Sequence, residues 1–462
     1  MNLEKIKTIL LTFLIIISLV LSGLLWNSTP QLENLAPSDY VAPPPAGHKY
    51  EVTDVIRPTA FILHTGNGRH MKAAVESGTY KKIQYEMDTW YFYDFARTRL
   101  TKEEWENIIN KKKAVEIVYS HEIPADIMPE LFTVRGRGAE EFRSASRILL
   151  YESREKNIVN ALFISDRDQQ VVRAHTSVTV GQMDSILSPN YLTHLPEQMM
   201  YRAFVHHREE AIHSNRYAFY QPIYLPKERE KMSRYRYFYQ PLTVRQVLEA
   251  MFVDVSLTRQ VTERDGTTIY TNGSQSVSIP AARNYLLYRY PVHEWEQAET
   301  KQANYEALNS ALSFVNRHGG WTGRYYLESV DMVEPERERT VTYRFRQYIG
   351  AYPLFSDGPD ENTISVRVSG GTVSELYYPM RQLDVYFERV PVTVVSGEEL
   401  IKRLEELGIS RQQVVSIELG LCTRPVYDFI EMKPCWTVRM TERPPIYIEA
   451  DATAFDKRAE GK

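Results

Sequence analysis

Apolar and polar residues alternate with period two most clearly after about residue 340. The segment 363–379 reads as two such strands, and Gly370-Gly371 between them suits a hairpin turn. The segment 396–408 begins with Ser396 and Glu399 in capping-box spacing and ends at Gly408, which predicts one helix. Contiguous hairpins followed by a helix form one sheet layer and one helix layer. We therefore predict that residues 340–455 fold as a mainly antiparallel sheet with one packed helix, followed by a polar tail at 456–462.

Shorter strand and helix patterns alternate between residues 50 and 339. Residues 50–180 contain the apolar strands "AFILH", "AVEIVYS" and "NALFIS", and a helix that Thr101 and Glu104 would cap. Residues 181–339 contain a helix after Thr243, a hairpin at Asn272-Gly273 and an apolar helix that ends at Gly319-Gly320. These patterns predict an α+β protein with an N-terminal domain over 50–180, a central domain over 181–339 and a C-terminal domain over 340–455.

The pattern is continuously apolar near the start of the chain. From Thr8 to Trp26 there is no Asp, Glu, Lys or Arg, and a helix of about 19 residues is about 28 Å long, close to the hydrocarbon thickness of a bilayer. A removable signal has a shorter apolar core, and cleavage after Val20-Leu21-Ser22 would cut inside this run. We therefore predict a retained transmembrane helix over 8–26, with removal as the alternative.

Basic residues around this segment predict its orientation. Lys5 and Lys7 precede it and the next basic residue is Lys49, so the positive-inside rule places residues 1–7 in the cytoplasm. The Pro-rich residues 27–49 favour an extended stalk. The sequence thus predicts a single-pass cell-membrane protein whose bulk is extracytoplasmic.

Small and hydroxylated residues mark one side of the predicted span. Ser18 and Ser22 are four residues apart, with Thr8 and Thr12 near the same side of the helix. Such residues allow close approach and hydrogen bonding between helices in lipid. The alternative is that these hydroxyls bond only to carbonyl groups of their own helix.

Charge and cysteine content exclude some classes of function. The formal net charge of −4 provides no basic field for nucleic acid. Residues 234–240 do interleave arginine with aromatic residues, as nucleic-acid-binding surfaces do, but alternating positions of a β-strand also explain that pattern. Cys422 and Cys435 are the only cysteines, too few for a metal cluster or a disulfide scaffold. They are a candidate disulfide, with buried free thiols as the equal alternative.

No motif predicts catalysis, a metal or a cofactor. His206, Glu209, Glu210 and His213 would share a helix face, but they do not form a zinc-protease motif and read as a solvated face. Ser153 and Lys156 have the S-x-x-K spacing of penicillin-binding enzymes without the K-T-G that should follow. The glycine pairs at 66–68 and 136–138 lack the third glycine of a dinucleotide-binding loop and predict turns. We expect a non-enzymatic protein without cofactors.

Several longer stretches together resemble the YycH family of two-component-system regulators. They are "VIRPTAFILHTGNGRH", "VEIVYSHEIPADIMPELF", "TIYTNGSQSVSI", "FVNRHGGWTGRYYL" and "IEMKPCWTVRM", and they run in order along nearly the whole chain. One position departs from the family pattern. An aromatic residue is expected after the strand 417–420, where this chain has Leu421-Cys422.

This resemblance implies a non-enzymatic regulator of a YycG-type sensor histidine kinase that controls cell-wall metabolism. It implies contacts through the membrane helix with the kinase and with a YycI-type partner, which the C-terminal domain would itself resemble. These predictions also allow a second copy of the chain as a partner, in a homodimer. The rival hypotheses are an anchored extracytoplasmic cell-wall enzyme, of penicillin-binding or metallohydrolase type, and a purely structural scaffold.

Overall fold

A computed structural model describes most of the chain beyond residue 46. The described residues are 7, 11, 13–19, 21, 47–136, 143–153, 157–203, 221–291, 304–333, 340–356, 358, 361–441 and 443–455. The chain forms two compact units, Met1–Pro43 and Pro44–Lys462. The described residues of the first unit are helical and carry exposed apolar side chains such as Phe13 and Leu19. Within the described part of the chain, no helix combines the length and the apolar character needed to cross a bilayer.

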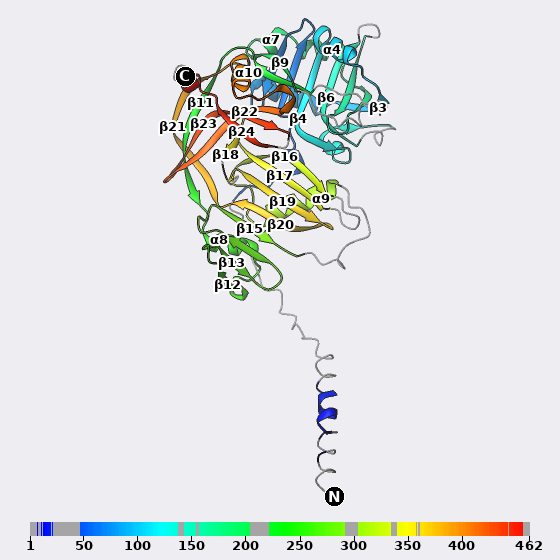
Figure 1. Cartoon of the computed structure of the whole chain (residues 1–462). Helices are drawn as coiled ribbons and strands as arrows, with labels where there is room; N and C mark the ends of the chain where they lie inside the picture. The colour runs from blue at the N-terminus through cyan, green and yellow to red at the C-terminus, as the bar shows by residue number, and fades with distance from the viewer. Residues whose placement is uncertain are drawn as a thin grey trace. The chain divides into compact units, whose positions relative to one another are not determined.

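The second unit contains a ten-stranded sheet built from the first half of the chain (Figure 1). Every neighbouring pair is antiparallel except β3 with β5. In spatial order its strands are β10 (Gln221–Pro226), β9 (Glu197–Ala203), β2 (His70–Ala74), β1 (Ala60–Thr65), β4 (Lys113–Pro124), β6 (Ser144–Ser153), β7 (Ile158–Ser165), β8 (Gln170–Thr176), β3 (Tyr91–Thr98) and β5 (Thr133–Val134).

Helices cover both faces of this first sheet. On one face α3 (Gly78–Met87) and α6 (Val180–Ile186) bury apolar side chains against strand residues such as Phe61 and Ile148. On the other face α4 (Lys102–Lys111) packs Trp105 and Ile108 against Leu149. The short helices α2 (Val52–Val55), α5 (Met128–Leu131) and α7 (Pro189–Leu192) complete this part of the unit. Because α4 covers only part of its face, the rest of that face is available to other elements.

A fourteen-stranded sheet forms most of the remainder. Its main path is β12 (Arg259–Thr262), β13 (Thr268–Thr271), β14 (Ser276–Ile279), β15 (Tyr285–Arg289), β20 (Thr372–Pro379), β19 (Thr363–Ser369), β17 (Thr340–Ile349), β18 (Tyr352–Ser356), β22 (Val414–Val426), β23 (Phe429–Met440), β11 (Glu230–Pro241) and β21 (Arg381–Val394). In addition, β16 (Arg324–Val333) pairs with β17 and β24 (Arg443–Glu449) pairs with β23. The parallel pair β18 and β22 joins its two antiparallel portions.

Three longer helices pack on this second sheet (Figure 1). They are α8 (Val244–Met251), α9 (Asn304–Arg317) and α10 (Gly397–Glu406), with the short 3-10 helices η3 (Val255–Leu257) and η5 (Arg411–Gln413) beside them. Ser396 and Glu399 form the expected capping box of α10. The α+β class is therefore confirmed, with sheet predominating.

Two apolar cores join the sheets. The larger contains first-sheet residues such as Phe61 together with Leu327 and Phe345 of the second sheet. The other combines Leu225 of β10 with Leu400 of α10 and with residues of β22 and β23. The structure does not test the predicted domain boundaries, which stay predictions.

Candidate functional site

A cavity of about 430 Å³ lies where the two sheets face each other. One wall is the part of the first sheet that α4 leaves uncovered, and the other belongs to β17, β18, β22 and β23. Both walls carry apolar and polar side chains. The first includes Ile62, Lys72, Ala74, Arg147 and Tyr224, and the second includes Tyr348, Tyr352, Ile417, Glu418, Leu419, Trp436 and Arg439. We call this space the intersheet cavity.

Strand register explains why charged residues reach the first wall. Ile62 lies opposite Lys72 on β2 and opposite Glu116 on β4, so these three side chains share one face. Arg147 lies opposite Val118, two residues from Glu116, and so belongs to that face as well. The opposite face carries the apolar residues of the larger core. Alternation therefore directs apolar side chains toward α3 and α6 on one face, and places these polar side chains on the other face, beside the part that α4 covers.

Glu116 is the centre of a buried polar network behind this wall. Its side chain is fully buried and accepts hydrogen bonds from Arg147 Nη1 at 3.1 Å and from the Tyr224 hydroxyl at 2.6 Å. Burial alone would raise the pKa of Glu116, but His64, Arg147 and Tyr224 outweigh it and hold that pKa at about 2. Arg147 Nε also lies 3.1 Å from Asp166 Oδ2. The guanidinium is thus neutralised by two carboxylates.

Two buried histidines extend the network along the sheet. His64 Nδ1 lies 2.8 Å from His70 Nδ1, and His64 Nε2 lies 3.4 Å from Glu116 Oε2. One histidine must donate and the other accept in the nitrogen contact, so the two cannot both be protonated there. Desolvation, reinforced by the charge of His64, lowers the pKa of His70 to about 4. The pair is therefore held in a state with at least one neutral ring.

A second charge cluster supports the opposite wall. The Glu328 carboxylate, on β16, pairs with Arg346 of β17 at 2.8 Å and with Arg439 of β23. Burial would raise the pKa of Glu328, but the two guanidinium groups lower it. Arg439 is also 3.9 Å from Glu418. The charge of Arg439 is thus largely neutralised on the cavity wall.

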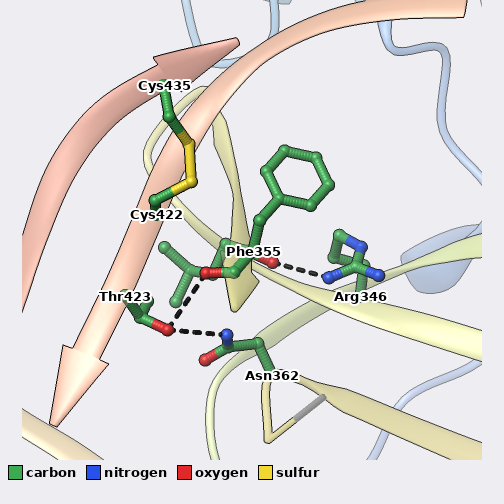
Figure 2. The surroundings of a disulfide bond; sticks show 7 residues. Arg346, Phe355, Asn362, Cys422, Thr423 and Cys435 are labelled. Carbon is green, nitrogen blue, oxygen red and sulfur yellow. Dashed lines mark hydrogen bonds between the residues drawn. A yellow bond between two sulfur atoms is a disulfide. The ribbon is translucent and has the colours of Figure 1, made fainter. Parts of the chain in front are cut away.

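The bridge between β18 and β22 holds this wall together (Figure 2). Arg346 donates to the Leu354 carbonyl at 2.7 Å, and the Thr423 hydroxyl donates to the Phe355 carbonyl at 3.1 Å. Asn362 donates to that hydroxyl at 2.9 Å. Figure 2 also shows the disulfide that joins Cys422 of β22 to Cys435 of β23. The bridge therefore combines backbone pairing, side-chain hydrogen bonds and a covalent link.

Three further charged groups face the cavity or its rim. Lys72 is half-buried, and among the described residues its ammonium group makes no hydrogen bond or ion pair. Desolvation raises the pKa of Glu230, whose side chain accepts a 3.4 Å hydrogen bond from Gln198. Desolvation likewise raises the pKa of Glu418. Burial therefore disfavours the charged form of both carboxyls, and the charge of the nearby Lys72 opposes this effect without an ion pair to either.

The structure covers only part of the predicted membrane face. Ser18 is helical and exposed, whereas Thr8, Thr12 and Ser22 lie outside the described residues. That interaction face stays a prediction.

Those of the other sequence candidates that the structure describes do not line the cavity. Ser153 ends β6, and Lys156 and the segment 206–213 lie outside the described residues. Gly66, Gly68 and Gly136 have positive φ, as turn glycines do. Residues 234–240 form part of β11. Among the described residues, no group of three His, Cys, Asp or Glu is placed to hold a metal ion.

The sequence carries one signal of the polar network, which was not predicted. Glu116 interrupts the apolar strand "AVEIVYS", and a charged residue in such a position needs a buried partner. Its partners Arg147 and Tyr224 are 31 and 108 residues away in the chain, so no local spacing could identify them.

Comparisons with known proteins agree along most of the chain. The family model described as YycH protein, N-terminal domain, matches residues 4–188, and that described as YycH protein, C-terminal domain, matches residues 220–451. A Bacillus subtilis (strain 168) relative named "Two-component system WalR/WalK regulatory protein YycH" is 22% identical over 347 residues, 72% of this chain and 70% of the relative. The crystal structure of YycH from Bacillus subtilis is similar with a TM-score of 0.67 at 14% identity, covering 88% of this chain and 99% of that one.

Proposed function

Because the chain belongs to the YycH family, we propose that it regulates a two-component system of the WalR/WalK type. The observation that carries the proposal is the match of both family domains to this one chain. The name of the Bacillus subtilis relative supplies the kind of system. The proposal gives the chain no catalytic step.

We further propose that regulation reaches the sensor kinase through the apolar N-terminal segment. Residues 8–26 would cross the membrane as one helix, with residues 1–7 in the cytoplasm and the two sheets outside the cell. Ser18, Ser22, Thr8 and Thr12 would face the helices of the kinase and of a YycI-type partner. Regulation then requires that this protein binds one kinase state more tightly than the other. A coupling of about 1 to 3 kcal/mol changes the balance about 5- to 150-fold.

Replacing the small residues of this face tests the proposal. The double variant Ser18→Leu with Ser22→Leu should change the output of the WalR-type response regulator, in either direction, by at least about twofold, because leucine blocks close helix approach. A transcriptional reporter of that regulator measures the output, and an immunoblot of membranes checks that the amount of protein is unchanged.

Ile17→Phe is the matched control. At about 100° per residue, Ile17 lies at least about 100° around the helix from each of Thr8, Thr12, Ser18 and Ser22, on the far side of the proposed face. This variant adds bulk in the same part of the segment and should leave the reporter unchanged. Unchanged output in the serine double variant would count against helix contact as the route. An unchanged reporter after deletion of the whole protein would instead favour the structural scaffold.

A further inference from the structure

The intersheet cavity has the size and composition of a small-molecule site. Its volume of about 430 Å³ lies in the range of about 300 to 1,000 Å³ that is usual for ligand pockets. Ile62, Ile417, Leu419 and Trp436 give it apolar walls, contributed by both sheets. A few polar groups converge among them, which is the arrangement that orients a ligand.

The polar groups left over in the cavity are mostly hydrogen-bond donors. Within the described residues, the ammonium group of Lys72 and the hydroxyls of Tyr348 and Tyr352 make no hydrogen bond to protein. The indole N–H of Trp436 is buried and has no acceptor in the same part of the chain. Buried donors without acceptors are costly, so a ligand rich in acceptors would be favoured here.

Charge in the cavity favours an anion over a cation. Arg147 is neutralised by Glu116 and Asp166, and Arg439 by Glu328, which leaves Lys72 as the lining cation without an ion pair among the described residues. Desolvation raises the pKa values of Glu230 and Glu418 even though the charge of Lys72 lowers them, so burial in the cavity disfavours the charged form of both carboxyls. Desolvation also raises the pKa of Tyr352 to about 12, so its phenol remains a neutral donor.

We propose that the intersheet cavity binds a small amphipathic anion. Its carboxylate or phosphate oxygens accept hydrogen bonds from Lys72 and from the hydroxyls of Tyr348 and Tyr352. Its apolar body packs against Ile62, Ile417 and Trp436. Such a ligand contacts both sheets at once and therefore stabilises one arrangement of them over others. Only the consequence that this ligand is an input for signalling rests on the proposed function; binding itself does not.

Three matched probes test the proposal by isothermal titration calorimetry on the purified full-length protein in detergent. The probes are 1-naphthaleneacetate, 1-naphthyl phosphate and 1-naphthaleneacetamide, which share an aromatic body and differ in the charged group. One or both anions should bind, one per chain, at least about tenfold more tightly than the neutral amide. Binding of the acetate alone or of the phosphate alone supports the proposal and identifies the head group.

Substitutions at the cavity then separate charge from shape. Lys72→Met should weaken anion binding about tenfold and leave the amide unchanged, whereas Lys72→Arg should retain anion binding. Lys231→Met is the matched control, because Lys231 is exposed on β11 beside Glu230 and does not line the cavity. Ala74→Phe, which shares the face of Lys72, should abolish binding of all three probes; Leu419→Trp fills the cavity from the other wall if Ala74→Phe does not fold.

Three results would overturn the proposal. The first is the absence of binding by either anion at a probe concentration of about 1 mM. The second is equal anion affinity in Lys72→Met and wild type, and the third is undiminished binding in the folded cavity-filling variant. The reporter assay with the Ser18 and Ser22 variants is independent of these measurements. Failure of that assay with intact probe binding would reject the helix route and retain the site.

Discussion

His70 makes the buried network sensitive to acid. Its side chain is only 4% exposed and its folded-state pKa of about 4 lies below the ordinary value of 6.5. Since the unfolded chain binds a proton more readily, the stability contributed by neutral His70 is fully present above pH 6.5 and is lost as pH falls toward 4. Glu116, with its pKa at about 2, adds a further loss below pH 4.5. Both groups therefore predict destabilisation by acid.

Replacing His70 should flatten this dependence. For wild type, the free energy of unfolding should fall between pH 7 and pH 4.5, with an upper limit of about 3 kcal/mol from this one group. His70→Gln removes the titrating ring, so urea unfolding at the two pH values should show a smaller difference. His175→Gln, at an exposed position of β8, is the control and should keep the wild-type difference. An equally steep loss in His70→Gln would assign the acid sensitivity to other groups.

At the scale of elements, the start of the folded unit is attached to the turn after α9. The Gly47 and His48 amides donate to the carbonyls of Gly319 and Trp321 at 3.1 and 3.0 Å, and Trp321 donates back to His48 at 3.0 Å. Gly320 makes this approach possible, because it has a φ of +71° and a Cβ there would lie 2.7 Å from the Gly47 carbonyl oxygen. Residues 47 and 48 of the second unit are thus bonded to the turn between α9 and β16.

Gly320→Ala should break this attachment. The alanine meets both an unfavourable φ and a backbone clash, whereas Gly273→Ala meets only the unfavourable φ of +95°, with open space around its Cβ. We expect Gly320→Ala to lower the free energy of unfolding by about 1 to 3 kcal/mol more than Gly273→Ala. Urea unfolding of the two variants measures the difference. Equal losses would show that the clash is relieved without detaching residues 47–48.

The elements that sequence analysis predicted correctly are those defined by local chemistry. Thr101 with Glu104 and Ser396 with Glu399 cap α4 and α10 as their spacing indicates, and Gly370-Gly371 joins β19 to β20. Pairing between distant strands was not predictable in this way. The strand β11 lies at 230–241, yet it pairs with β21 and β23, which come after residue 380. Its alternating pattern shows that it is a strand and carries no information on its partners.

At the scale of the whole molecule, the cavity depends on how the two sheets are joined. The larger core and the core around Leu225 each contain residues of both sheets, and the intersheet cavity is lined from both sheets as well. Neither sheet alone would enclose this space. The cavity could not be predicted from sequence for the same reason as the polar network, since its walls come from residues hundreds of positions apart.

Joint cores predict that the two sheets unfold together. Leu225 is fully buried on β10 of the first sheet and packs in the core that includes Trp436, while Trp90 lies in the larger core. Leu225→Ala should lower the free energy of unfolding by about 2 to 5 kcal/mol. If the cores are coupled, urea transitions followed by the separate fluorine NMR signals of Trp90 and Trp436, in protein whose six tryptophans are replaced by fluorotryptophan, should shift to the same lower midpoint. Tyr427→Ser, at a side chain that is 96% exposed, should shift neither. A shift at Trp436 without one at Trp90 would show two independently folding bodies, and a ligand in the cavity between them would then act by drawing those bodies together.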